Sequence, residues 1–179
     1  APGFIRILKK HFPNATVTLW PNPSTRPGTH REIEPEVLAF YKTYFPDVRI
    51  LPAGKSQPGS DSFHPELLEA FELADMLVVG SGGMHVQPAI QWVNHTKKPY
   101  GFYGVSVSSE SARNRDILRE AAFALCRDSV SVQHLREQGI DTEGFEFCPD
   151  SAFGFDIRND TAANEFLTSV GIGENPLLC

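Results

Sequence analysis

Apolar residues recur every three or four positions in several segments, which alternate with short apolar runs. The first such segment lies behind Pro2, a residue favoured in the first turn of a helix, and carries Phe4, Ile5, Leu8 and Phe12 at helical spacing. The same spacing predicts helices over residues 35–45, 65–74, 87–95, 111–121, 129–138 and 161–170. Runs rich in β-branched, aromatic and aliphatic residues predict strands over residues 16–20, 48–51, 75–80, 100–107, 123–127 and 145–147.

Inward faces and ends can be assigned for several of these helices. Residues that share a helical face predict the buried stripes, which are Val37, Leu38, Tyr41 and Phe45 in one helix and Leu67, Leu68 and Phe71 in the next. His64 or Ser62 is suited to start the second of these helices, and Gly139 and Gly171 to end later ones. The boundaries therefore agree with the apolar pattern.

Strands that alternate with helices require crossover connections, which indicate an α/β fold with a doubly wound, mainly parallel sheet. Two long segments rich in Pro, Gly, Ser and Thr, residues 21–33 and 52–61, each follow a predicted strand. Both are expected at the carboxyl edge of the sheet, where open α/β folds bind ligands. In the first segment Thr25, Arg26, His30 and Arg31 could hold an anion or a sugar, although a solvated surface loop explains them equally well.

Composition narrows the classes of ligand. The 179 residues suffice for one substantial domain, and a net charge of −6 gives no basic excess for nucleic acid or an anionic membrane surface. No apolar run reaches the ~18 residues of a membrane span. Cys126, Cys148 and Cys179 are too few and too dispersed for a disulfide framework, which favours a reducing, cytoplasmic compartment. A small molecule is therefore the expected ligand.

The most distinctive short string is Gly80-Ser81-Gly82-Gly83, which follows the predicted strand over residues 75–80 and precedes a helix. Glycines at such a turn let backbone amides approach a phosphate, a carboxylate or a sugar oxygen, but a tight turn explains them equally well. The string matches neither a dinucleotide-binding nor a Walker motif. His85 lies just beyond it and is a candidate general acid or base.

Charged residues follow two further predicted strands. Arg127 could hold a carboxylate or phosphate with two hydrogen bonds, or form an ordinary surface ion pair. Asp128 is suited to cap the next helix, and Asp150 is either a turn residue or a ligand contact. We include all three among the candidate binding residues.

Together these strings resemble a known family. The order of ADMLVVGSGG (74–83), KPYGFYGVSV (98–107), CRDSVSVQHLREQG (126–139) and CPDSAF (148–153) is similar to the amino-terminal half of polysaccharide pyruvyl transferases. In one place the chain departs from the family, because Val105-Ser106-Val107-Ser108-Ser109 stands where a Gly-Pro pair is common. That departure affects the expected shape of the loop after the Lys-Pro strand.

The resemblance implies a Rossmann-like half of a two-domain architecture similar to glycosyltransferases of the B type. The amino-terminal domain would cover residues 1–171 with its first strand missing, and residues 172–179 would begin an absent second domain. The site would lie between the domains. Phosphoenolpyruvate would react with two hydroxyls of a sugar in a cell-surface polysaccharide, giving a pyruvate ketal and phosphate.

The resemblance also implies a division of labour between the two halves. The donor would bind mainly to the second half, so this half would hold the acceptor sugar through Gly80, Ser81, Gly82, Gly83, His30, Arg127, Asp128 and Asp150, with His85 as acid or base. The chemistry requires neither a metal nor another cofactor. Two other readings stay open: one half of a nucleotide-sugar glycosyltransferase, and a complete, non-catalytic flavodoxin-like binding domain.

Overall fold

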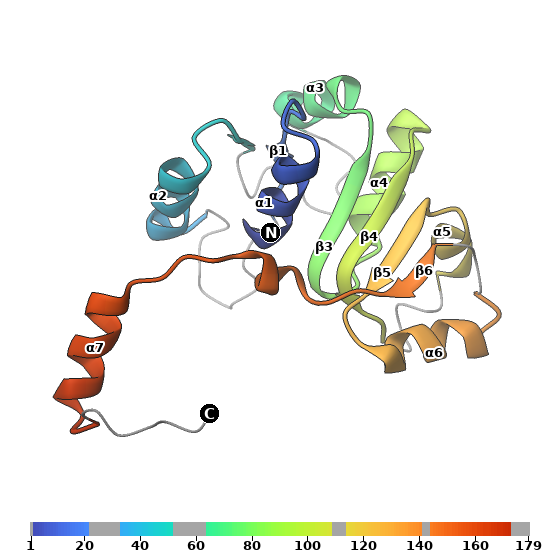
Figure 1. Cartoon of the computed structure of the whole chain (residues 1–179). Helices are drawn as coiled ribbons and strands as arrows, with labels where there is room; N and C mark the ends of the chain where they lie inside the picture. Colours follow the sequence, from blue (N-terminus) through green and yellow to red (C-terminus); the bar gives the residue numbers. More distant parts are fainter. Residues whose placement is uncertain (1, 22–32, 52–63, 109–113, 141–143, 173–179) are drawn as a thin grey trace.

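The computed structural model describes residues 2–21, 33–51, 64–108, 114–140 and 144–172 of the chain. A four-stranded parallel sheet lies at its centre, in the order β3-β4-β5-β6 (Figure 1). Its strands are β3 (Leu77–Gly83), β4 (Tyr100–Ser106), β5 (Phe123–Cys126) and β6 (Phe145–Phe147). A second, two-stranded parallel pair consists of β1 (Thr18–Leu19) and β2 (Arg49–Ile50).

Helices connect these strands in the predicted alternation. They are α1 (Pro2–His11), α2 (Pro35–Tyr44), α3 (Pro65–Leu73), α4 (Gln87–Thr96), α5 (Arg115–Arg119), α6 (Ser129–Glu137) and α7 (Asp160–Ser169). A short 3-10 helix, η2 (Ser151–Gly154), was not predicted. The α/β class and the parallel sheet are confirmed, as is the approximate position of every predicted strand and helix.

The described residues form two hydrophobic clusters, and the larger one includes residues of the four-stranded sheet. The larger cluster joins Phe102 of β4 to helices α3, α4, α5 and α6, and buries Trp92 and Leu135 almost completely. The smaller cluster joins Ile5 of α1 to α2 and the β1–β2 pair. Successive residues of a strand point to opposite faces, and Tyr103, next to Phe102, contacts the ring of Phe4 in α1 at 4.6 Å between centroids. Helices therefore cover both faces, as in a doubly wound fold.

Some predicted inward positions are wrong. Leu68 is 37% exposed and Val37 is 41% exposed, whereas Ala70 is buried in place of Leu68. Phe12 lies beyond the end of α1 and is 63% exposed. Apolar residues at helical spacing define a broad stripe along one side of a helix. Residues at the border of this stripe stay exposed to water when the structure that packs against the helix is narrower than the stripe.

The helix boundaries have identifiable causes. The imidazole of His64 accepts a hydrogen bond from the amide of Glu66 and caps α3. His64 is one of the two residues predicted to start this helix. At the other end of α3, the Lys98 ammonium donates to the carbonyl oxygens of Phe71, Glu72 and Ala74 at 3.1, 2.7 and 2.8 Å. Lys98 therefore satisfies carbonyl groups that the end of a helix leaves without partners.

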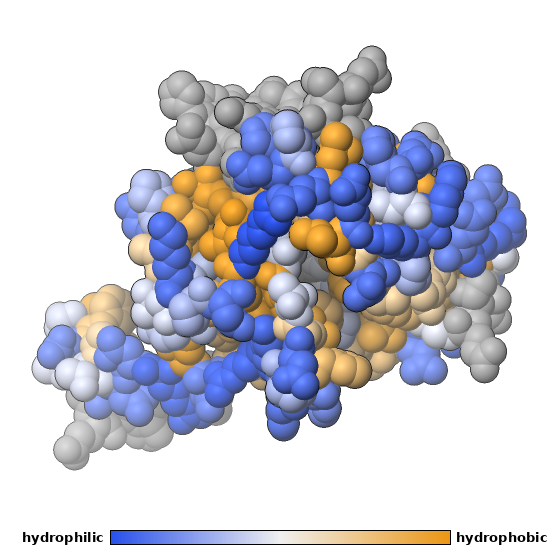
Figure 2. All heavy atoms as spheres, turned by 90° about the horizontal axis from the view of Figure 1, so that it is seen from above, coloured by the Kyte–Doolittle hydropathy of each residue, from blue (hydrophilic) through white to orange (hydrophobic). Residues whose placement is uncertain are grey.

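The last helix differs from the others. No residue of α7 is buried, and the helix lies apart from the sheet (Figure 1). Seen from above, hydrophilic residues form most of the outline of the molecule and hydrophobic residues show between them (Figure 2). Within the described part of the chain, no helix has the length and apolar character needed to cross a membrane.

Several sequence-based expectations fall outside the described residues. These are the binding role of His30, most of the two long loops, Cys179 and the expected start of a second domain over residues 173–179.

Candidate functional site

Polar side chains gather where three neighbouring strands end. Ser106 is the last residue of β4, Arg127 and Asp128 follow β5, and Asp150 lies three residues after β6. Because β4, β5 and β6 are parallel neighbours, these ends meet at one edge of the sheet. We refer to Ser106, Arg127, Asp128 and Asp150 as the carboxyl rim.

The glycine string does not form the predicted loop. Gly80 to Gly83 continue β3 and pair in parallel with β4, with Gly80 opposite Tyr103 and Gly82 opposite Val105. The helix α4 begins only after three further residues. The string was predicted to be a turn because glycine is rare inside strands, yet it pairs with β4 in constant register, and within it Gly82 alone has a positive φ, of 95°.

A bulge lies between β4 and β5. Tyr103 pairs with Leu125 and Val105 pairs with Cys126, so two steps along β4 match one step along β5. Gly104 has φ 63° and Gly82, beside Val105 in β3, has φ 95°, both in the left-handed region that favours glycine. The extra residue leaves Val105 in the same buried cluster as Phe102.

This shift decides where Ser106 points. Without the bulge, residues 102, 104 and 106 would share a face. With it, Phe102 and Val105 share the larger cluster, and Ser106 is directed to the opposite face. Arg127 follows the buried Cys126 and lies on that face too. The bulge therefore brings the hydroxyl and the guanidinium together.

Two nitrogens of the Arg127 guanidinium donate hydrogen bonds to side chains of the rim. Its Nε donates to Ser106 Oγ at 2.9 Å and its Nη1 donates to Asp150 Oδ2 at 3.0 Å. The single hydrogen of Nε is used by Ser106, so the Nε–Nη2 pair is not free to chelate a carboxylate ligand, whereas each Nη nitrogen carries two hydrogens. The ion pair expected as the alternative is therefore present, and the side chains of Arg127 and Asp150 are 37% and 26% exposed.

Asp128 acts as the predicted helix cap and has a second role. Its Oδ1 accepts from the amide of Ser131 at 2.7 Å, which caps α6, and its Oδ2 accepts from Ser106 Oγ at 2.7 Å. Burial raises the pKa of Asp128, but the hydrogen bonds of Ser106 and Ser131 and the charge of Arg127 outweigh it, so the pKa is lowered. The carboxylate is therefore ionised at neutral pH.

Asp150 has a similar double role. Its Oδ1 accepts from the amide of Ala152 at 2.9 Å and caps η2, which accounts for the predicted turn. This backbone hydrogen bond, together with the hydrogen bond and charge of Arg127, lowers the pKa of Asp150. Both rim carboxylates are thus weak bases and good hydrogen-bond acceptors.

Tyr103 lies beside the rim on the α1 side of the sheet. Burial raises its pKa to about 12, assisted by a hydrogen bond with Cys148 and by the charges of Cys148 and Asp150. The phenol is therefore protonated at neutral pH.

The segment after Asp150 is held against α1. A Cβ added to Gly3 would lie 1.6 Å from the carbonyl oxygen of Ser151, and one added to Gly154 would lie 2.5 Å from the side chain of Ile7. The two segments therefore approach closely only because both positions are glycine. This packing positions the turn that carries Asp150.

His85 lies between β3 and α4 and is exposed. The preceding residue, Met84, donates its amide to the carbonyl oxygen of Ser106 at 2.9 Å, so the chain passes the end of β4 here. None of the hydrogen bonds recorded between described residues joins the His85 ring to the carboxyl rim. Its role as an acid or base stays a prediction, and of Ser81 only the backbone is described.

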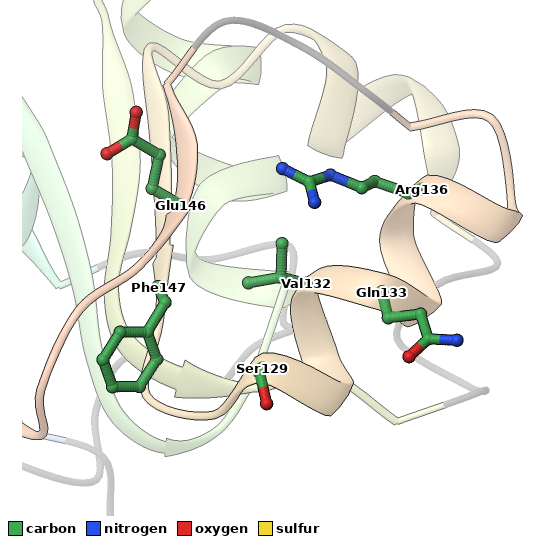
Figure 3. A pocket seen from close by; sticks show the side chains of 6 residues that line it. All are labelled: Ser129, Val132, Gln133, Arg136, Glu146 and Phe147. Carbon is green, nitrogen blue, oxygen red and sulfur yellow. The ribbon is translucent and has the colours of Figure 1, made fainter.

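A surface hollow of about 650 Å³ lies beside the outer strand, between α6 and β6. The side chains of Val132 and Arg136 extend from α6 toward Glu146 and Phe147 of β6 (Figure 3). No predicted site residue lines this hollow, so it is separate from the carboxyl rim.

Sequence reasoning missed three members of the network around the rim, namely Ser106, Tyr103 and Ser131. The signal for Ser106 was its place at the end of a predicted strand next to the strand that carries Arg127. Among the residues that the structure describes, no cluster of three or more His, Cys, Asp and Glu side chains could hold a metal ion.

The family profile described as polysaccharide pyruvyl transferase matches residues 1–172. No curated protein and no solved structure matches the chain significantly. The family match covers the sheet, the carboxyl rim and the helices on both faces, so the chain belongs to the polysaccharide pyruvyl transferase family.

Proposed function

We propose that this chain forms one wall of a site that transfers a pyruvyl group from phosphoenolpyruvate to two hydroxyls of a polysaccharide sugar. The match of the family profile to residues 1–172 carries this proposal. Two C–O bonds form between the sugar oxygens and the central carbon of the donor, and the bond from that carbon to the phosphate oxygen breaks. One hydroxyl proton ends on the donor's methylene carbon, which becomes a methyl group, and the other leaves with phosphate.

The charges of the carboxyl rim favour the acceptor sugar over the donor. One guanidinium and two ionised carboxylates leave a local charge of about −1, because the pKa of both Asp128 and Asp150 is lowered. Phosphoenolpyruvate carries a carboxylate and a phosphate, both of which this charge repels. A neutral sugar instead offers hydroxyl donors to the carboxylates, and its oxygens can accept from Nη2 of Arg127.

The end of β3 is assigned to the proposed acceptor wall. Gly80, Gly82 and Gly83 give it little side-chain bulk beside β4, which allows a sugar ring to approach the backbone. His85 follows this strand end and is assigned the proton transfers that the hydroxyls and the enol carbon require. His30 and Ser81 stay candidate acceptor contacts from the sequence, since His30 and the Ser81 side chain lie outside the described part of the chain.

The donor is assigned to a second domain outside residues 1–171, with the reaction in the cleft between the two domains. Its carboxylate and phosphate require guanidinium or amide donors that are not already paired, and Arg127 is paired with Asp150. We further propose a cytoplasmic site of action, since Cys126 and Cys148 are free thiols.

The experiment uses the full-length polypeptide that contains these residues. Purified protein is incubated with phosphoenolpyruvate and an acceptor oligosaccharide, phosphate release is measured, and the product mass is checked for an added pyruvate ketal. Phosphate release that depends on the acceptor supports the proposal. Turnover only with a nucleotide sugar would identify a glycosyltransferase instead, and sugar binding without turnover of either donor would identify a binding domain.

Two variants separate acceptor binding from donor binding. Asp150→Asn removes a rim carboxylate and is expected to raise the KM for the acceptor while leaving the KM for phosphoenolpyruvate unchanged. Asp156→Asn is the matched control, because Asp156 is 71% exposed and pairs with Arg158 outside the rim. An increase in the KM for the donor alone would assign the rim to phosphoenolpyruvate and refute this division.

A further inference from the structure

Ser106 occupies the centre of the carboxyl rim. Its hydroxyl donates to Asp128 Oδ2 at 2.7 Å and accepts from Arg127 Nε at 2.9 Å. Both hydrogen bonds involve a charged group, and such bonds are stronger than those between neutral groups. The single hydroxyl thus uses its donor and an acceptor position to join two residues that are adjacent in sequence.

The rim would rearrange without this hydroxyl. Arg127 Nε would lose its hydrogen-bond acceptor, and Asp128 Oδ2 would lose its donor. A guanidinium without an acceptor would then lie next to a carboxylate without a donor. A direct pair between Arg127 and Asp128 would satisfy both groups. It would also draw the guanidinium away from Asp150, which now accepts from Nη1 at 3.0 Å.

The backbone supports this position specifically. Val107, the residue after Ser106, donates its amide to Ser131 Oγ at 2.9 Å, and Ser131 is in turn the residue that Asp128 caps. The residue after Ser106 is therefore fixed to the start of α6, and the carbonyl oxygen of the residue before it accepts from the amide of Arg127 at 3.0 Å. The bulge at Gly104 then directs the Ser106 side chain to the face where Arg127 lies.

We propose that Ser106 is a positioning residue of the acceptor site, which holds the Arg127 guanidinium on Asp150 and separates it from Asp128. This extends the proposed function, because it assumes that the rim binds the acceptor sugar. Ser106 itself does not contact the sugar in this proposal. It fixes the orientation of Arg127 and the two carboxylates, whose hydrogen-bonding positions not used within the rim are offered to the sugar.

The first test does not depend on activity. The titration of the Asp150 carboxyl group is followed by NMR in the wild type, Ser106→Ala and Ser106→Thr. The charges that act on Asp150 are those of Arg127 and the amino terminus, Tyr103 is a titratable neighbour, and only the position of the guanidinium should change. We expect the pKa of Asp150 to rise toward its ordinary value in Ser106→Ala and to stay low in Ser106→Thr, which keeps the hydroxyl. An unchanged titration in Ser106→Ala would overturn the proposal.

The second test measures transfer by the full-length protein. The KM for the acceptor should rise about tenfold in Ser106→Ala, the worth of one charge-assisted hydrogen bond, with the KM for phosphoenolpyruvate unchanged. Ser106→Thr should restore the wild-type value, and the control Ser129→Ala, an exposed hydroxyl on α6, should not change it. An equal increase for both substrates, or no rescue by threonine, would overturn the positioning role.

The two proposals fail in different ways. If the wild type transfers no pyruvyl group to any acceptor, the proposed function is wrong, and the titration of Asp150 still decides the role of Ser106. If Ser106→Ala does not fold, Ser106→Cys replaces it, since a thiol has similar size and forms weaker hydrogen bonds. The pKa of Asp150 should then lie above that of the wild type, and an unchanged value would refute the proposal.

Discussion

Replacing Lys98 with methionine tests what holds α3 to the sheet. Methionine keeps most of the length and apolar character of the side chain but removes the ammonium. The three carbonyl oxygens of Phe71, Glu72 and Ala74 then lose their donor. Lys98 belongs to the Lys-Pro string at the start of β4, so its role connects a sequence motif to the end of a helix.

The expected loss is about 2–3 kcal/mol. A hydrogen bond from a charged group contributes roughly 1.5–3 kcal/mol, so three bonds at the lower limit give about 4.5 kcal/mol. Ordering a lysine side chain costs up to about 2 kcal/mol of entropy, and the methionine does not incur this cost because no hydrogen bond holds it in one rotamer. The lower limit is appropriate because Lys98 is only half-buried and water can reach part of the site.

Urea denaturation followed by circular dichroism measures this loss, with an unchanged m value as the sign that the unfolding transition itself is the same. The thermal midpoint should fall by roughly 5–10 °C for a chain of this length. Lys42→Met is the matched control, because Lys42 is exposed at the end of α2, and it should change the unfolding free energy by less than about 0.5 kcal/mol. If Lys98→Met is as stable as this control, the ammonium does not stabilise the end of α3.

Three further predictions concern other parts of the molecule. Gly3→Ala should destabilise by about 2 kcal/mol in urea denaturation although alanine favours helices, because its Cβ would lie 1.6 Å from the Ser151 carbonyl oxygen; a stabilised variant would refute this packing. Lys97→Gly should raise the unfolding free energy by about 1 kcal/mol, since Lys97 has φ 56°, and a lower thermal midpoint would contradict this. Asp150→Asn should cost about 0.5–1 kcal/mol at pH 7, because the partly exposed pair with Arg127 is lost. The folded-state pKa of Asp150 is lowered, so its contribution is present above the unfolded value of 3.8 and disappears as pH falls through the folded value; a difference that persists in acid would exclude this cause.

Much of the fold could be predicted because the chain repeats one simple pattern. Apolar residues at helical spacing and short aliphatic runs located each helix and strand, and the caps at His64 and Asp128 follow from side chains that accept hydrogen bonds. The wrong predictions of burial concern the end of a helix, as at Phe12, and its solvent-exposed border, as at Leu68. Those positions depend on the width of the neighbouring layer, which local sequence does not encode.

The candidate site was predictable in part. Arg127, Asp128 and Asp150 were selected because they follow strands, and parallel pairing does bring them to one edge. The hydrogen-bond partners of Arg127 could not be predicted, because they depend on which residues the fold places beside β5. The glycines were assigned to a loop because the sequence shows their flexibility but not that β3 continues alongside β4 as far as Gly83.

The extra residue at Gly104 has a consequence for comparison with related sequences. A side chain that does not adopt the φ of 63° at this position would favour regular pairing at the same strand length, which turns the serine hydroxyl to the face of Phe102 and away from the guanidinium. Deleting Gly104 would instead restore a regular two-residue repeat with Val105 and Ser106 on their present faces, because the residue removed is the extra one. A related sequence with β4 one residue shorter can therefore keep the same rim, whereas one of equal length without a glycine there would signal a different arrangement even where all four rim residues are retained.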